Sequence, residues 1–121
     1  MAKDNLYLAV FLGSQTTPQF AAWLKLSDAE RAARGREGIA AWKKWAADHA
    51  AQIVEMGGPL GKTKKVSSEG IADISNDMGG FTVVRAASHE EAAKLFAQHP
   101  HFTIFPGDRI EVMPVMPVPA G

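Results

Sequence analysis

The sequence predicts an α+β fold: a ferredoxin-like βαββαβ protomer with an antiparallel four-stranded sheet, assembled as a dimeric α+β barrel. Residues 6–12 are apolar at every position, which is typical of a strand that is covered on both faces. Residues 80–86 have the pattern of a second such strand and lead directly into a capped helix. Because only two main helices are expected, one face of the sheet needs another cover.

Composition and charge narrow the class of protein. The 121 residues suffice for a single domain, 1–121, with a substantial core. Lys plus Arg and Asp plus Glu both number 13, and this zero formal charge argues against nucleic-acid or anionic-membrane partners. The absence of cysteine excludes disulfides, thiolate metal sites and a cysteine nucleophile. With no signal-peptide pattern and no apolar run near the ~18 residues of a membrane span, we expect a cytoplasmic protein.

Two helices are expected after the first strand. Thr17-Pro18 offers a cap followed by proline, which opens a short helix. Ser27 and Glu30 form a capping box at the start of a longer helix, which we expect to end at Gly57. The longer helix carries a stripe of residues at spacings of three and four: Ile39, Trp42, Ala46, His49 and Ile53. Gly35 and Gly38 weaken its first half, so either the helix breaks there or another backbone packs against it.

The middle of the chain reads as a turn, a strand and a loop. Residues 57–61 are rich in glycine and predict a helix stop and a turn. Residues 62–67 follow as a short strand whose lysines suit the edge of a sheet. From 68 to 78 the periodicity fades, which predicts a long loop at the rim of a pocket or over it.

The last third of the chain gives the clearest pattern. The strand 80–86 is followed by Ser88 and Glu91, which form an S-x-x-E capping box for a helix that ends near His99, because Pro100 disfavours helical backbone before it. Residues 102–108 form a connection, and 109–115 are expected to form the last strand, at an edge, before a proline-rich tail.

The apolar character of the strands predicts a partner. Two helices cover one face of a four-stranded sheet, yet residues 6–12, 81–86 and 110–113 offer apolar side chains to both faces. The simplest cover for the second face is the same sheet of another copy, since two-fold homodimers are the commonest oligomers. We therefore expect a homodimer.

Several motifs together resemble the YCII-related, or DGPF-domain, family. They are Gly58-Pro59-Leu60 before a strand, the segment Gly79-Gly80-Phe81-Thr82-Val83-Val84, the Ser-x-Glu-Glu-Ala helix, His99-Pro100-His101, and the closing Ile110-Glu111-Val112-Met113-Pro114-Val115. The match runs from about Trp42 onward. The resemblance implies a dimeric α+β barrel of ferredoxin-like protomers, with a pocket between helices and sheet that holds a histidine used in acid/base chemistry.

Histidines are the first candidates for a catalytic role, because imidazole exchanges protons near neutral pH. His49 and His99 continue the apolar stripes of the two main helices toward the sheet, and His101 follows His99 by two residues. Trp42 and Trp45 are candidate walls of a ligand pocket. The alternative is that these histidines belong to the core and are satisfied by backbone carbonyls or water.

Two further features of the sequence bear on the candidate site: an arginine that could bind an anion, and a histidine pair that could bind a metal. Arg85 is a candidate anion-binding residue, although it could equally pair with a carboxylate at the rim of the sheet. His99-x-His101 could ligate a metal only if the chain were extended and His49 or Asp108 supplied a third ligand. We expect no metal and no other cofactor.

Two main hypotheses for the function follow. The first is a small-molecule-binding homodimer that works as a cofactor-independent enzyme, with His49 or His101 as the acid/base. The second is a non-catalytic ligand-binding or interaction module that meets a protein partner through residues 68–78 or the proline-rich tail. A third, weaker hypothesis is a cofactor-free or haem-linked monooxygenase, as in other dimeric α+β barrels.

Overall fold

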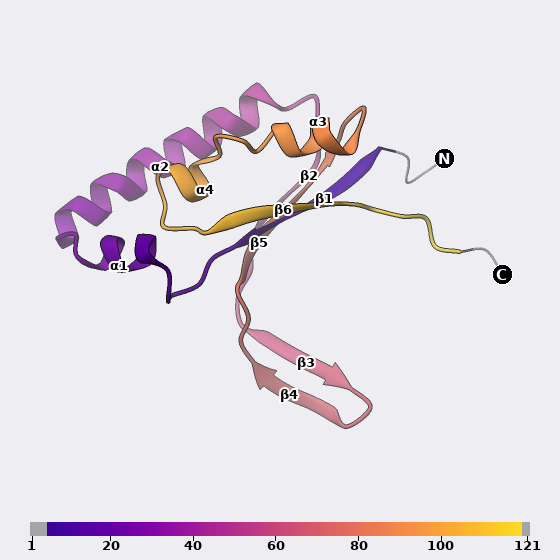
Figure 1. Ribbon diagram of the computed structural model, residues 1–121, viewed down its shortest axis with the longest axis horizontal. Helices are drawn as coiled ribbons and strands as arrows, with labels where there is room; N and C mark the ends of the chain where they lie inside the picture. The colour runs from indigo at the N-terminus through magenta and orange to yellow at the C-terminus, as the bar shows by residue number, and fades with distance from the viewer. Residues whose placement is uncertain (1–4, 120–121) are drawn as a thin grey trace.

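The computed structural model describes residues 5–119 and has the expected α+β architecture (Figure 1). The elements are β1 (Leu6–Leu12), α1 (Pro18–Leu24), α2 (Asp28–Asp48), β2 (Ile53–Pro59), β3 (Thr63–Ser67), β4 (Gly70–Ile74), β5 (Met78–Arg85), α3 (His89–Lys94), α4 (Pro100–Thr103) and β6 (Arg109–Pro114). Four strands form an antiparallel sheet in the order β2-β5-β1-β6, which is the ferredoxin-like arrangement. The predicted α+β class and ferredoxin-like sheet of the protomer are confirmed.

The sheet places its core on one face, under the helices (Figure 1). β1 is central, as expected, with β5 on one side and β6 on the other. Because side chains alternate along a strand, Tyr7, Ala9 and Phe11 all lie on the buried face. Trp45 of α2 and Phe96 after α3 pack against them. This layer of aromatic residues between helices and sheet is where the candidate site forms.

Side-chain caps fix where the helices begin. The Thr17 hydroxyl accepts a hydrogen bond from the backbone N–H of Phe20, at 3.2 Å, at the start of α1. At α2, Ser27 and Glu30 form the full reciprocal capping box that the sequence predicts. The Ser88 hydroxyl accepts from the backbone of Glu91 at the start of α3. Each bond satisfies an amide that the helix itself leaves without a partner.

The second helix ends earlier than predicted, at Asp48 rather than at Gly57. The residues from Ile53 onward form β2, which pairs with β5 at the edge of the sheet. Ile53 fits the spacing of the preceding helix, but it belongs to a strand in the structure. The strand forms because it supplies hydrogen-bond partners to the edge of β5, which would otherwise lack them. Gly57 has a φ of +67°, and a Cβ there would overlap the carbonyl group of Phe81, so the expected turn is instead an irregular part of this strand.

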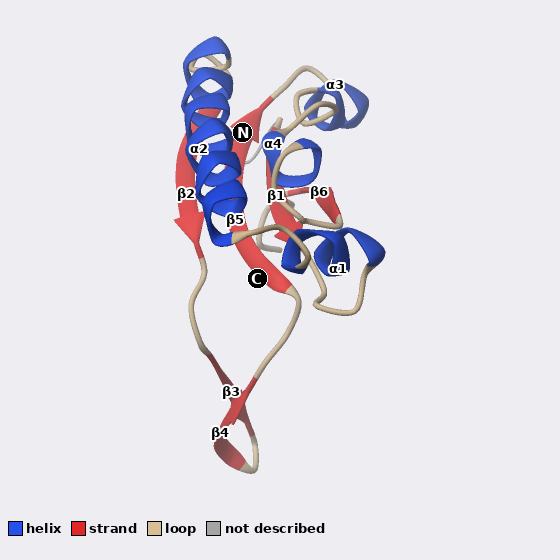
Figure 2. Ribbon diagram, turned by 90° about the vertical axis from the view of Figure 1, so that its left-hand side faces the viewer, coloured by secondary structure: helices blue, strands red, loops and turns tan. Residues whose placement is uncertain are grey.

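The strand expected at 62–67 is present as β3, but it does not lie at the edge of the main sheet, and the long loop expected at 68–78 contains a further strand, β4. β3 and β4 pair only with each other in a two-stranded hairpin, closed by Ser67 opposite Gly70. Gly70 has a φ of +115°, which glycine adopts without strain. Figures 1 and 2 show the hairpin projecting from the body of the protein, away from the helices.

The segment after β5 also differs in its helices. α3 ends at Lys94 instead of near His99, and a separate short helix, α4, occupies the start of the expected connection. Proline at the first position of α4 and His99 as its N-cap explain the new start. The last strand ends at Pro114 and lies at the edge of the sheet, as predicted.

Glycines and one apolar residue in α2 show how the helix meets its neighbours. The helix continues through Gly35 and Gly38. A Cβ on Gly38 would overlap the ring of Phe105, so a side chain, not a backbone, makes the close approach there. The prediction that Ile39 lies in the buried stripe is wrong: it is 55% exposed, because it lines an open cleft instead of packing into the core. Among residues 5–119, no helix combines the length and apolarity needed for a membrane span.

Candidate functional site

A cleft of about 550 Å³ lies between α2, the glycine-rich ends of β2 and β5, and the segment around α4. Its walls are mostly apolar, with Phe11, Trp42, Met56 and Phe105 among the lining residues. The volume is within the range of small-molecule sites, about 300–1,000 Å³. The cleft can therefore enclose a ligand of one or two rings.

Four glycines form part of the cleft wall: Gly57 and Gly58 on β2, and Gly79 and Gly80 on β5. A Cβ on Gly80 would lie 3.1 Å from the Phe11 ring and 3.2 Å from the carbonyl oxygen of Gly58. Backbone, rather than side chain, therefore borders this part of the cleft, and a flat ligand can approach the main chain closely.

His101 is the imidazole that lines the cleft. Its Nε2 is 2.8 Å from the carbonyl oxygen of Leu12, and since a carbonyl only accepts, Nε2 carries the proton and donates. The ring stacks on Phe11 with centroids 5.5 Å apart and rests on Gly107, where a Cβ would overlap it. The Nδ1 atom has no partner within the described chain and is not buried. One nitrogen is therefore fixed and the other is open.

His99 lies behind the cleft and is completely buried. Aromatic rings surround its imidazole; those of Trp42 and Trp45 meet it edge-on, with centroids at 4.4 Å and 4.7 Å. Its Nδ1 accepts a hydrogen bond from the backbone N–H of His101, at 3.0 Å, so the proton of the neutral ring is on Nε2, which has no hydrogen-bond partner. Burial, together with the nearby imidazoles of His101 and His49, lowers the pKa of His99 to about 3.

His49 lies at the end of α2 and does not line the cleft. Its Nδ1 donates to the carbonyl oxygen of Trp45, at 2.9 Å, and its ring lies 5.1 Å from the ring of Trp45. The indole nitrogen of Trp45 donates to the carbonyl oxygen of Leu95, at 2.8 Å. His49 is therefore linked to the aromatic layer through Trp45, while His99 and His101 lie on its other members, Trp42 and Phe11.

Arg85 lies at the end of β5, opposite Leu6 in the register, and is exposed. Alternation along the strand places it on the opposite face from Val84, which is fully buried under the helices. It is not among the residues that line the cleft. Of the six candidate residues, the structure brings Trp42, Trp45, His99 and His101 together, with His49 beside Trp45 and Arg85 apart.

Some residues that line the cleft were not predicted from the sequence. Lys43 lines the cleft one turn after Ile39 on α2, and Phe105 reaches it from the segment after α4. The spacing of Ile39, Trp42 and Lys43 on one side of a helix is a pattern that could have indicated the first of these. Within residues 5–119, no three His, Asp or Glu side chains cluster as metal ligands would.

Comparison with known proteins gives a likeness in structure. No protein-family model matches the chain, and no curated protein matches it. The structure is similar to that of 5-chloro-2-hydroxyhydroquinone dehydrochlorinase from Burkholderia phenoliruptrix, solved in complex with 2,5-dihydroxybenzoquinone. The TM-score is 0.51 at 17% sequence identity, over 89% of this chain and 90% of the other. The likeness supports the α+β fold alone and does not show membership of the YCII-related, or DGPF-domain, family.

Proposed function

We propose that this protein binds a small, flat, largely apolar molecule in the cleft, and that His101 exchanges a proton with the bound molecule. The observation that carries the proposal is the arrangement of His101, which lines a mostly apolar cleft: Nε2 is anchored to the backbone at Leu12, and Nδ1 has no hydrogen-bond partner among residues 5–119. An imidazole held in this way can accept or donate a proton without reorienting. The reaction class is proton transfer or an elimination or isomerisation that depends on it.

The other predicted site residues take supporting roles in this proposal. Trp42 provides an apolar wall for the ligand. Trp45 packs against His99 in the aromatic layer behind that wall. His99 positions His101 through the backbone hydrogen bond described above. His49 is hydrogen-bonded to Trp45 and does not line the cleft, so it would not contact the ligand directly. Arg85 also lies outside the cleft. The similar dehydrochlorinase, which acts on a hydroxylated ring, supports testing ring-shaped ligands first.

The experiment compares His101→Gln with His89→Gln. Both imidazoles donate a hydrogen bond from Nε2 to a backbone carbonyl of the sheet, His89 to Val112 at 2.7 Å, but His89 is exposed on α3. Titration calorimetry with 2,5-dihydroxybenzoquinone and related hydroxylated rings measures binding, and proton NMR in heavy water detects exchange at the bound molecule. Binding by the wild type, with exchange lost only in His101→Gln, is the expected result. Equal exchange in all three proteins would contradict the proposal.

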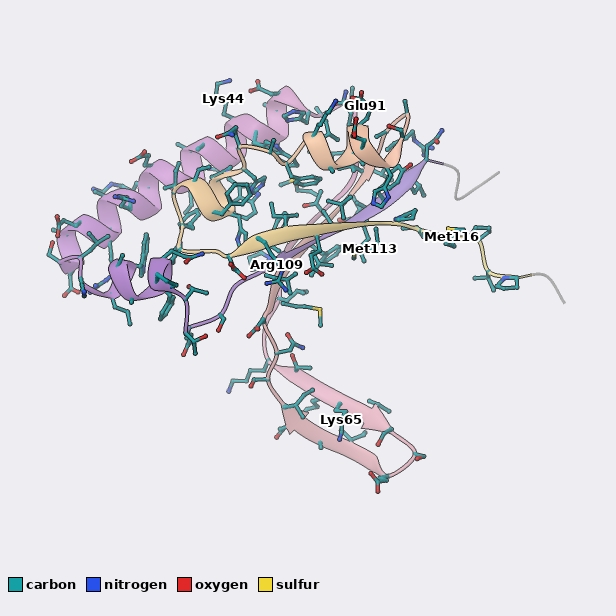
Figure 3. All side chains as sticks on the ribbon, in the orientation of Figure 1. Lys44, Lys65, Glu91, Arg109, Met113 and Met116 are labelled. Carbon is teal, nitrogen blue, oxygen red and sulfur yellow. The ribbon has the colours of Figure 1, made fainter. Side chains whose placement is uncertain are left out.

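We also propose that the protein is a homodimer, joined through the face of the sheet that the helices leave open. Residues that alternate with the buried ones lie on this face, namely Leu6, Leu8, Val10, Phe81 and Val83. Met113 of β6 continues it, opposite Leu8, and is 38% exposed (Figure 3). A compact monomer of 13.0 kDa exposes about 6,300 Å². This chain exposes 8217 Å², an excess of about 1,900 Å².

The projecting hairpin contributes to that excess, but the excess is still more than the share of one partner in a standard interface, about 800 Å². Sedimentation velocity at micromolar concentration should give the mass of a dimer, and Leu8→Glu should convert it to a monomer. A monomer in the wild type would contradict the dimer without affecting the proposal for the cleft.

The hairpin supports a second candidate function, a non-catalytic interaction module. Val66 and Ile71 face each other across β3 and β4 and are 76% and 71% exposed. An isolated two-stranded hairpin is marginally stable, so these side chains suit packing against another surface. If this function is the right one, replacing both residues by threonine should abolish binding of a protein partner to the hairpin and leave ligand binding in the cleft unchanged.

A further inference from the structure

The ionisable side chains that line the cleft are all basic. Within the described residues they are Lys43 and His101, and no aspartate or glutamate contributes to the wall. Lys43 is exposed on α2, so water solvates its ammonium group, and no carboxylate of the cleft wall occupies it as an ion-pair partner. The cleft therefore favours a ligand that brings a negative charge of its own.

Lys43 is distinguished from its neighbour by the lack of an ion pair. The Nζ atom of Lys44 lies 2.6 Å from the carboxylate of Asp48, one turn further along α2. Figure 3 shows Lys44 on the outer side of the helix. In contrast, no carboxylate among residues 5–119 lies within ion-pair distance of Lys43. The two adjacent lysines thus differ in both direction and partner.

We infer that the ligand is an anion: a flat apolar ring bearing one ionised oxygen, carboxylate or phenolate, that binds to the ammonium group of Lys43. This inference rests on the proposed function of the cleft. The apolar body of such a ligand would lie against Trp42 and the glycine backbone of β2 and β5. The long side chain of Lys43 lets its charged end remain near water until the ligand arrives. His101 then meets the ligand inside the cleft.

A matched pair of probes tests the charge alone. Naphthalene-2-carboxylate and naphthalene-2-carboxamide have nearly the same shape and differ in charge, and titration calorimetry gives the affinity of each. The wild type should bind the carboxylate about tenfold more tightly than the amide, because charge-assisted hydrogen bonds are about twice as strong as neutral ones. Lys43→Gln should abolish the preference, Lys43→Arg should keep it, and Lys44→Gln should leave it unchanged.

The phenolate arm of the test uses 4-nitrophenolate against 4-nitroanisole at a pH where the phenol is ionised. A preference in one arm alone identifies the kind of anion. Equal affinity for the charged and neutral probe in both arms would overturn the inference and leave the proposed function standing. Failure of every probe to bind the wild type would overturn the proposed function and the inference together. A charge preference that survives in Lys43→Gln would contradict the role of this lysine.

Discussion

The buried imidazole of His99 accepts a hydrogen bond from the backbone of His101, which lines the cleft. His99 is the N-cap of α4, and His101 lies in the first turn of that helix. The core histidine therefore fixes the position from which the other histidine reaches the cleft. One residue of the His99-Pro100-His101 motif is suited to a structural role and the other to chemistry.

The first prediction is that His99→Ala destabilises the protein by about 3 kcal/mol, because it removes a helix cap and leaves a cavity among aromatic rings. Urea denaturation followed by tryptophan fluorescence measures the free energy of unfolding. The control is His89→Ala on the exposed surface of α3, for which the loss should stay below about 1 kcal/mol. Equal losses for the two variants would refute the packing role of His99.

The second prediction concerns pH. Burial lowers the pKa of His99 from 6.5 to about 3, so the unfolded chain binds a proton below pH 6.5 that the folded chain does not. The associated stability is complete above pH 6.5 and is lost as the pH falls toward 3, a loss of the order of 4 kcal/mol. His99→Phe should show a smaller loss between pH 7 and pH 4, measured by urea denaturation. Parallel curves for the two proteins would contradict this explanation.

The third prediction is that Gly107→Ala weakens ligand binding by displacing the ring of His101. A Cβ at this position would overlap both the ring and the backbone oxygen of His101, which accepts a hydrogen bond from the Gly107 amide at 2.9 Å. We expect a loss of about 1–3 kcal/mol in stability as well, since overpacking strains the site. The proton NMR signals of the imidazole provide the direct measurement. An unshifted His101 signal would show that the ring tolerates the methyl group.

The fourth prediction uses two glycines of the same helix. A Cβ on Gly38 meets the ring of Phe105, whereas a Cβ on Gly35 meets nothing within 4 Å. Gly35→Ala should raise the free energy of unfolding by about 0.5–1 kcal/mol through helix propensity. Gly38→Ala should lower it by about 1–3 kcal/mol, because the ring must move. Thermal unfolding of both variants tests the pair; a Gly38→Ala variant as stable as Gly35→Ala would show that Phe105 does not constrain the helix.

The sequence predicts the parts of the fold that depend on local chemistry. The continuous apolar run of β1 and the serine and threonine caps are local, and the structure confirms them. β2 was missed because Ile53 also fits the helical spacing, and only pairing with β5 decides between the two. β3 is confirmed as a strand, but β4 and the hairpin were not predicted because the alternation of β4 is short, although Gly70 after Ser68-Glu69 is a turn signal.

The candidate site was predictable only in part. The motif around His101 stands out in the sequence because of its composition, and Trp42 because of its helical spacing. The position of Lys43 at the cleft depends on how α2 lies over the sheet, which no local pattern specifies. The same holds for the separation of Arg85 from the cleft, since the face of a strand that a helix covers is a tertiary property.

The glycine wall of the cleft limits how its specificity can be altered. Substituting Gly57 forces a side chain into the neighbouring strand, so that position resists change. Gly58 has open space around it, so a larger residue fits there without a clash and would change the surface at this end of the cleft. New ligand preferences are therefore most accessible through α2 and the segment around Phe105, where side chains can be exchanged while the main-chain surface keeps its shape.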